Sequence, residues 1–145
     1  DSEIMSVVPV IFAASEGQDD AQVIRRFIAD RFDVWERRRD LMRVVIGEAM
    51  FNPALAEGLR GKIQLALQGV EGFIVRRMQD GAFRPVHPGI AARALIGQLL
   101  SVFLHWSLLM PHGNLPPREQ LIDELTALFM HGVLRQSIDE EEKVR

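Results

Sequence analysis

The four histidines are the side chains most able to do acid–base or metal chemistry in this sequence: His87, His105, His112 and His131. None belongs to an HExxH sequence or to a Glu-x-x-His pair, the spacings that build metal sites on helices. His87 and His112 adjoin prolines and are interpreted as solvated turn residues. His105 lies about one helical turn from Ser101, and we interpret it as a core or interface histidine in preference to a ligand contact. The histidines therefore predict no metal site and no acid–base pair.

No nucleophile or phosphate-binding motif accompanies them. The sequence contains no GxSxG, no P-loop and no GxGxxG, the local patterns that position a serine nucleophile or a nucleotide phosphate. Cysteine is absent, which excludes thiol nucleophiles, disulfides and zinc ribbons and fits a reducing compartment. The adjacent carboxylates Asp19 and Asp20 and the acidic run 139–142 lie in a break and in a tail, where no pocket would surround them. We predict that the chain is not an enzyme and has no catalytic residues, no metal and no cofactor.

Length and composition fit a single soluble domain. The 145 residues are 48% hydrophobic and 26% charged, enough for a compact domain with a sizeable core. The formal net charge is −3, which argues against a nucleic-acid surface, because neutralising phosphates needs an excess of Lys and Arg. No basic segment precedes the apolar run Ile4–Ala14, so we expect no signal peptide and a cytoplasmic location. Because the chain opens on Asp1, it is expected to be part of a longer protein.

Hydrophobic periodicity predicts helices along almost the whole chain. Strand-like alternation is absent, and there is no tyrosine. The first helix would be kinked by Pro9, and the acidic end of the chain is expected to be a solvated tail. We therefore expect one helical domain over residues 1–137 and a tail over 138–145. The expected helices span residues 3–15, 21–35, 41–50, 53–80, 89–110 and 118–136.

Capping residues mark the ends of these helices. Ser, Thr, Asp and Asn cap the first turn well, and proline suits the first helical position, where its missing N–H costs nothing. Gly81 is expected to end the long fourth helix in a left-handed conformation. The glycines of GLRG and GVEG inside that helix are interpreted as close-packing points. The expected N-caps are Asp19 or Asp20, Asp40, and Asn52 followed by Pro53.

The helix expected over residues 89–110 is apolar on two faces. Its length approaches that needed to span a bilayer, but Arg93 and His105 and the lack of a basic flank argue against a membrane span. A step of 100° per residue places small, mildly polar residues on one face and bulky ones, such as Leu95, on the other. The last helix also has two apolar stripes, so we predict a twofold homodimer, with a single well-buried core as the alternative. The expected dimer interface comprises Ala94, Gly97, Ser101, His105, Leu125, Leu128, Phe129 and Gly132.

Three segments carry a family pattern: NPALAEGL from Asn52, DGAFRPVHPGIAARAL from Asp80, and LFMHGVL from Leu128. Over about Ala21–Leu134 this pattern resembles the C-terminal regulatory domains of TetR/AcrR-family transcriptional repressors. The resemblance implies an all-α antiparallel helical bundle whose last two helices form a dimeric four-helix interface. It also implies a small-molecule cavity among the central helices, and an operator-binding helix-turn-helix that would precede Asp1. Ligand binding would then relieve repression by a population shift.

Large apolar side chains on the central helices are the candidate cavity walls. Mostly apolar clefts with a few polar groups are typical of ligand sites, so we expect a small apolar or aromatic effector, with Gln98 as a polar anchor. The alternative for each of these residues is an ordinary place in the core. The alternative for the chain is a stand-alone helical dimerisation or scaffold module with neither ligand nor DNA-binding role. The expected ligand-binding residues are Phe27, Trp35, Met42, Phe73, Gln98, Phe103 and Trp106.

Overall fold

A computed structural model of the chain describes residues 11–12, 17–109 and 114–136. The regular structure of these residues is helical apart from an isolated bridge, which confirms the predicted all-α fold. The helix expected over residues 3–15 and the tail lie outside the described residues, except that Ile11 and Phe12 are helical. The described helices are α2 (Asp20–Arg37), α3 (Arg39–Ala49), α4 (Pro53–Gln79), α5 (Pro88–Ser101), the π-helix η1 (Val102–Leu109) and α6 (Arg118–Val133).

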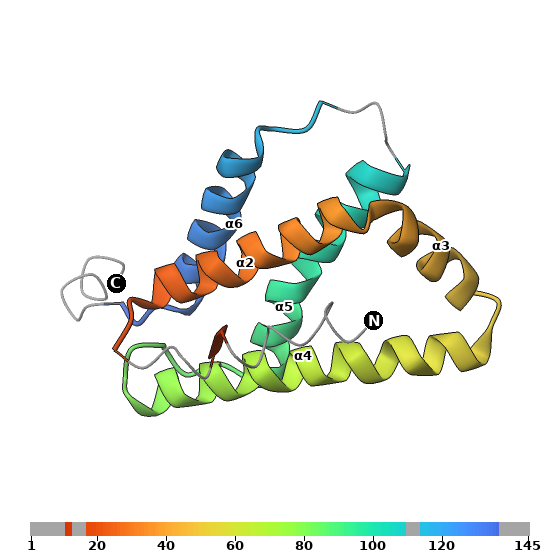
Figure 1. The fold of residues 1–145 in the computed structure, drawn as a ribbon. Coiled ribbons are helices and arrows are strands. Elements are labelled where there is room, and N and C mark those ends of the chain that lie inside the picture. Colours follow the sequence, from red (N-terminus) through yellow and green to blue (C-terminus); the bar gives the residue numbers. More distant parts are fainter. Residues whose placement is uncertain (1–10, 13–16, 110–113, 137–145) are drawn as a thin grey trace.

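In Figure 1 three helices follow the sides of a triangle, and α5 crosses the space between them. The long helix α4 forms its base, α2 crosses above it, and α3 joins the two at one corner. The helix α5 packs against α4 and continues as η1, whereas α6 packs against α2 and against α5. The sequence predicted one helix over residues 89–110, and the structure changes its hydrogen-bonding pattern from α to π at Val102.

Most of the predicted caps form. The Asp19 side chain accepts a hydrogen bond from the backbone N–H of Gln22 at 3.3 Å. The Asn52 side chain accepts from the N–H groups of Ala54 and Leu55 at 3.1 and 3.2 Å, with Pro53 as the first helical residue. These oxygens satisfy donors that the first helical turn leaves unpaired.

The predicted cap at Asp40 is wrong. The helix α3 follows α2 after a single residue, so Arg38 occupies the cap position and makes no side-chain capping hydrogen bond. Asp40 lies in the first turn of α3 instead. Its negative charge still complements the partial positive charge of the helix N-terminus there.

The turn between α4 and α5 is tied to the end of α6. Gly81 has φ 81°, and the N–H of Ala82 bonds to the carbonyl of Arg77 at 3.0 Å, which ends α4 as predicted. The Arg84 N–H then donates to Val133 O at 2.8 Å, beside the bridge between Phe83 and Leu134. The fully buried ring of Phe83 anchors this turn in the core.

The core is formed by large apolar side chains from every described helix except α3. The Phe73 ring lies 5.1 Å from that of Phe12 and 5.9 Å from that of Phe83, measured between centroids. Phe73 of α4 therefore contacts both Phe12, which precedes α2, and Phe83, in the turn that follows α4. The aromatic rings bury large apolar areas, the dominant favourable contribution to folding.

One stretch of the described chain, Pro88–His105, is long and apolar enough to cross a membrane by length and composition alone. It is 33% buried, and a core helix of a soluble protein passes the same test. The buried side of α5 packs into the core through Ala92, Leu95 and Leu99.

Candidate functional site

A cavity of about 370 Å³ opens among α2, α3, α4, α5 and η1. At roughly 30 Å³ for each non-hydrogen atom, the share of a water in the liquid, it would hold about 12 such atoms. Its walls are almost entirely apolar, as in most small-molecule sites. The apolar lining side chains are Phe27, Val34, Trp35, Leu41, Met42, Val45, Ile46, Leu55, Leu59, Ile63, Ala66, Ile96, Leu99, Leu100 and Phe103.

Two stacked aromatic rings form part of the wall. The ring of Trp35 lies parallel to that of Phe103, with centroids 4.7 Å apart and an interplanar angle of 6°. Phe32 meets the same phenylalanine edge-on at 5.2 Å. Phe103 is the second residue of the π-helix, and π-helical turns recur at functional sites because they shift side chains out of the α-helical register.

Within the described residues, the polar side chains of the cavity are Arg31 and Lys62, together with the indole N–H of Trp35. Arg31 is nearly buried, with 11% of its side chain exposed, and its Nε donates to Asp30 at 3.0 Å. Asp30 itself is not among the lining residues. Arginine, lysine and the indole group are hydrogen-bond donors without acceptor capacity. The polar groups of the lining side chains are therefore donors, apart from the weak thioether acceptor of Met42.

The cavity wall formed by α3 is partly exposed to solvent. No residue of this helix is buried, although Met42 and Ile46 pack against the core. Leu41, which lines the cavity, is 40% exposed. The side chain of Phe51, in the connection to α4, is 86% exposed. A bound ligand would bury apolar surface of α3 that the protein alone leaves in water.

The structure brings four of the predicted ligand-binding residues together at this cavity: Phe27, Trp35, Met42 and Phe103. Phe73 lies in the core against Phe12 and Phe83 and does not reach the cavity. Gln98 lines a different hollow, between α5 and α6. The backbone of Trp106 belongs to η1, and its side chain lies outside the described residues. Whether the four bind a ligand stays a prediction.

Sequence reasoning missed the two cations and several aliphatic walls. Leu55, Leu59 and Ile63 lie within the helix expected over residues 53–80, but they were not among the predicted ligand-binding residues. Lys62 lies within one helical turn of Leu59 and Ile63, so it borders the apolar face that they form. A lysine next to the apolar face of this helix was the signal in the sequence that could have indicated a cation at the cavity.

The small face of α5 and part of α6 remain uncovered in the single chain. Six of the predicted interface residues are exposed: Ala94, Gly97, Ser101, His105, Leu128 and Gly132. Leu125 is half-buried and packs against the core. Phe129 is already buried within one chain, and it lines the hollow between α5 and α6 that also contains Gln98. Interface formation by this face stays a prediction.

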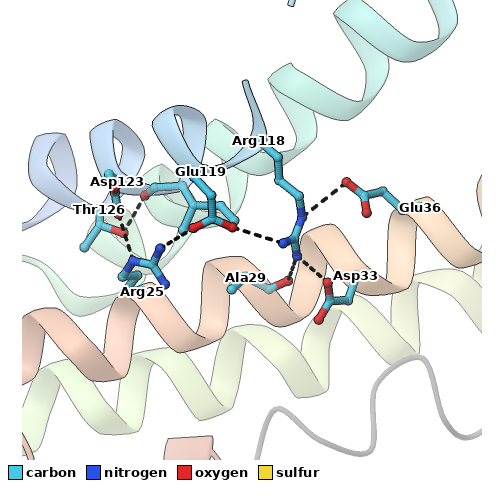
Figure 2. Close-up of polar contacts among 9 residues, drawn as sticks. Arg25, Ala29, Asp33, Glu36, Arg118, Glu119, Asp123 and Thr126 are labelled. Atoms are coloured by element: carbon cyan, nitrogen blue, oxygen red, sulfur yellow. Dashed lines mark hydrogen bonds and ion pairs between the residues drawn. The ribbon is translucent and has the colours of Figure 1, made fainter. Parts of the chain in front are cut away.

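A group of ion pairs holds α2 against α6 (Figure 2). Arg25 donates to Asp123 at 2.8 Å and to Glu119 at 2.6 Å. Hydrogen bonds to Asp123, and then to Glu119, raise the pKa of Arg25 above its ordinary value. Arg118 pairs with Asp33 and also donates to the carbonyl oxygen of Ala29 at 3.4 Å.

The described histidines take no part in the cavity. The Nδ1 atom of His87 accepts a hydrogen bond from the N–H of Ile90 at 3.3 Å and so caps α5, a role that the sequence did not predict. His105 and His131 are exposed, and His112 lies outside the described residues. No three His, Cys, Asp or Glu side chains gather into a possible metal site within the described ranges.

An all-α fold with an apolar cavity among its central helices places the chain among small helical domains that have room for a ligand. The sequence matches the family described as AefR-like transcriptional repressor, C-terminal domain, over residues 10–132. No curated protein and no solved structure gave a match. The chain belongs to this family of TetR-type C-terminal domains, as the sequence pattern indicated, and its role is that of a regulatory domain in transcriptional repression.

Proposed function

We propose that this domain dimerises and senses a small effector. Effector binding would relieve repression by the TetR-like repressor to which the domain belongs. The observation that carries the proposal is the apolar cavity of about 370 Å³ among α2, α3, α4, α5 and η1. Its size and its few polar groups fit an apolar or aromatic ligand of drug-like or smaller size. The proposed ligand contacts are Phe27, Trp35, Met42 and Phe103.

Phe27 provides a route from the cavity to the N-terminal side of the domain. This residue lines the cavity, and its ring lies 5.3 Å from that of Phe12. Arg76 on α4 also donates to the carbonyl oxygen of Phe12 at 3.4 Å. A ligand that displaces Phe27 would therefore move the residues that lead toward an operator-binding helix-turn-helix. Differential affinity of the ligand for two such arrangements shifts the population away from the DNA-binding one.

The proposed partner is a second copy of the chain, placed against the uncovered face of α5 and α6. Apolar exposure on this side supports the proposal: Leu128 is 66% exposed in the single chain, and an interface would remove it from water. Gln98 lines the hollow with Ala94, Leu128 and Gly132. Its role would then be in the interface, not in effector binding.

The test uses 2-naphthol, a neutral aromatic probe of suitable size, in isothermal titration calorimetry. A Cβ placed on Gly58, which lines the cavity, or on Gly61, which does not, meets nothing within 4 Å. We expect the unmodified chain and Gly61→Phe to bind 2-naphthol, and Gly58→Phe to lose binding because its ring enters the cavity. Circular dichroism checks that both variants fold.

Light scattering completes the experiment. A dimer that binds 2-naphthol and loses this binding in Gly58→Phe supports the proposal. A dimer without any binding of 2-naphthol would indicate the scaffold module that the sequence left open. A strictly monomeric chain at micromolar concentration would contradict the dimer.

A further inference from the structure

The polar side chains of the cavity share one chemical property. The guanidinium of Arg31, the ammonium of Lys62 and the indole N–H of Trp35 all donate hydrogen bonds, and two of them carry positive charge. Among the residues that the structure describes, no Asp, Glu, Ser, Thr, Asn or Gln lines the cavity. Most carbonyl groups inside helices accept backbone hydrogen bonds. A ligand that bonds to the described polar side chains of the lining must therefore offer acceptors.

The charge of the cavity is opposite to that of the chain. The chain has 20 acidic and 17 basic side chains, for a formal net charge of −3. The described part of the lining nevertheless includes two cations and no carboxylate; Asp30, which pairs with Arg31, lies beside the cavity. A neutral apolar effector would gain little from these cations, and a cationic one would be repelled in surroundings of low dielectric constant.

We propose that the effector is an amphipathic organic acid, with one carboxylate and an apolar body of about ten carbons. This proposal rests on the proposed function, since it names the ligand class of the same cavity. The carboxylate meets Lys62, and the body lies against the stacked rings of Trp35 and Phe103. An ammonium carries three donors, so it can add a ligand oxygen to the contacts that it already makes.

Arg31 is a secondary contact of the ligand carboxylate, after Lys62. It is already hydrogen-bonded to Asp30, which offsets its charge. Lys62 is half-buried on α4, where its apolar stem can lie along the wall while its ammonium stays near water. This arrangement suits a ligand whose body enters the cavity first and whose charged group remains near the surface.

The proposal is tested with three probes that share a ten-carbon chain: decanoate, 1-decanol and decyltrimethylammonium. Each is titrated calorimetrically into the chain at neutral pH, where a carboxylic acid is ionised. We expect decanoate to bind about tenfold more tightly than 1-decanol, the preference that one charge-assisted hydrogen bond gives. We expect decyltrimethylammonium to bind more weakly than either. The affinity for decanoate, and not that for 1-decanol, should fall as ionic strength rises.

Variants of Lys62 test where the carboxylate lies. Lys62→Gln should lower the affinity for decanoate much more than that for 1-decanol and so remove most of the preference, while Lys62→Arg should retain it. Arg60→Gln is the matched control, because Arg60 is an exposed cation on the same helix that does not line the cavity. Unchanged preference in Lys62→Gln would overturn the role of this lysine.

The outcomes for the ligand class and for the proposed function are separable. If decanoate binds no more tightly than 1-decanol, the effector is not an organic acid. The effector-sensing function still stands in that case if 1-decanol or 2-naphthol binds and Gly58→Phe abolishes this binding. Failure of every probe to bind, 2-naphthol included, contradicts both.

Discussion

Phe27 packs against Phe12, with ring centroids 5.3 Å apart, and also lines the apolar cavity. Phe12 in turn contacts Phe73 of α4 at 5.1 Å. The residues before α2 are therefore fixed to the same pair of helices that form two walls of the cavity. Any change in the spacing of α2 and α4 reaches Phe12 through direct contact, because close-packed side chains transmit displacement.

A double-mutant cycle tests the Phe12–Phe27 contact. Phe12→Leu and Phe27→Leu should each lower the free energy of unfolding by about 1 kcal/mol. The double variant should show a coupling energy of about 0.5–1.5 kcal/mol, the value of an aromatic pair beyond its buried area. Urea denaturation followed by circular dichroism provides the measurement. The control cycle pairs Phe12→Leu with Phe129→Leu on α6, which should be additive; equal coupling in both cycles would contradict a specific contact.

The ion pair between Arg118 and Asp33 gives a second prediction, for the attachment of α6 to α2 (Figure 2). Both side chains are partly exposed, at 35% and 52%, so the pair is expected to contribute about 0.5–1 kcal/mol. Arg118→Ala should lower stability by about 1 kcal/mol, because Ala29 O also loses a donor. A double-mutant cycle with Asp33→Ala measures the coupling.

The Arg60–Glu57 pair within α4 is the matched control for that cycle, since both of its side chains are about 70% exposed. Its coupling should stay near 0.3 kcal/mol, as for exposed pairs on one helix. Coupling energies that do not differ between the two pairs would show that the α2–α6 contact adds nothing to an ordinary surface pair.

The sequence predicted which helix faces are apolar but not what each face meets. The stripe of α4 is continuous in sequence, yet Leu59 lines the cavity while Phe73, further along the same stripe, lies in the core. Hydrophobic periodicity indicates that one face of a helix is buried. The angle at which α2 and α5 cross α4 decides where the face meets a neighbour and where it meets a void, and no local pattern contains that angle.

Two other predicted features have surroundings in the structure that the sequence did not indicate. The glycines of GLRG were expected to mark close packing, but a Cβ on Gly58 or Gly61 meets nothing within 4 Å. Gln98 was expected to anchor the ligand, yet it lies on the small face of α5 between α5 and α6. That position could have been inferred, because Ala94 and Ser101 share the face with it. The caps at Asn52 and Gly81 were predictable because they depend on neighbouring residues alone.

Substitutions of Gly97 and Leu95 distinguish the proposed interface from the core of the single chain. Gly97 is exposed and its Cβ position is open, whereas Leu95 is fully buried. Gly97→Leu should therefore weaken dimerisation at least tenfold without a steric clash inside one chain. Leu95→Ala should lower the free energy of unfolding by about 2–5 kcal/mol and affect dimer affinity less. Sedimentation equilibrium measures the former and urea denaturation the latter.

Gly61→Leu, at an equally open helical glycine of α4 outside the proposed interface, controls for the added side chain. It should leave dimer affinity unchanged. Dimer affinities that are alike for Gly97→Leu and Leu95→Ala would place the interface on a different face of α5.

The last prediction concerns Gly81, which ends α4 with φ 81° and thereby directs the chain to Phe83 and α6. A Cβ at this position meets no atom within 4 Å, so any effect of Gly81→Ala comes from backbone conformation alone. Left-handed backbone disfavours residues with a Cβ, and we expect a loss of about 1–2 kcal/mol in the free energy of unfolding. Gly47→Ala is the control, because Gly47 is an equally open glycine inside α3 and should stabilise the helix by about 0.5–1 kcal/mol. Thermal and urea denaturation should thus move in opposite directions for the two variants, and a stabilised Gly81→Ala would show that the left-handed end of α4 is not required for the turn.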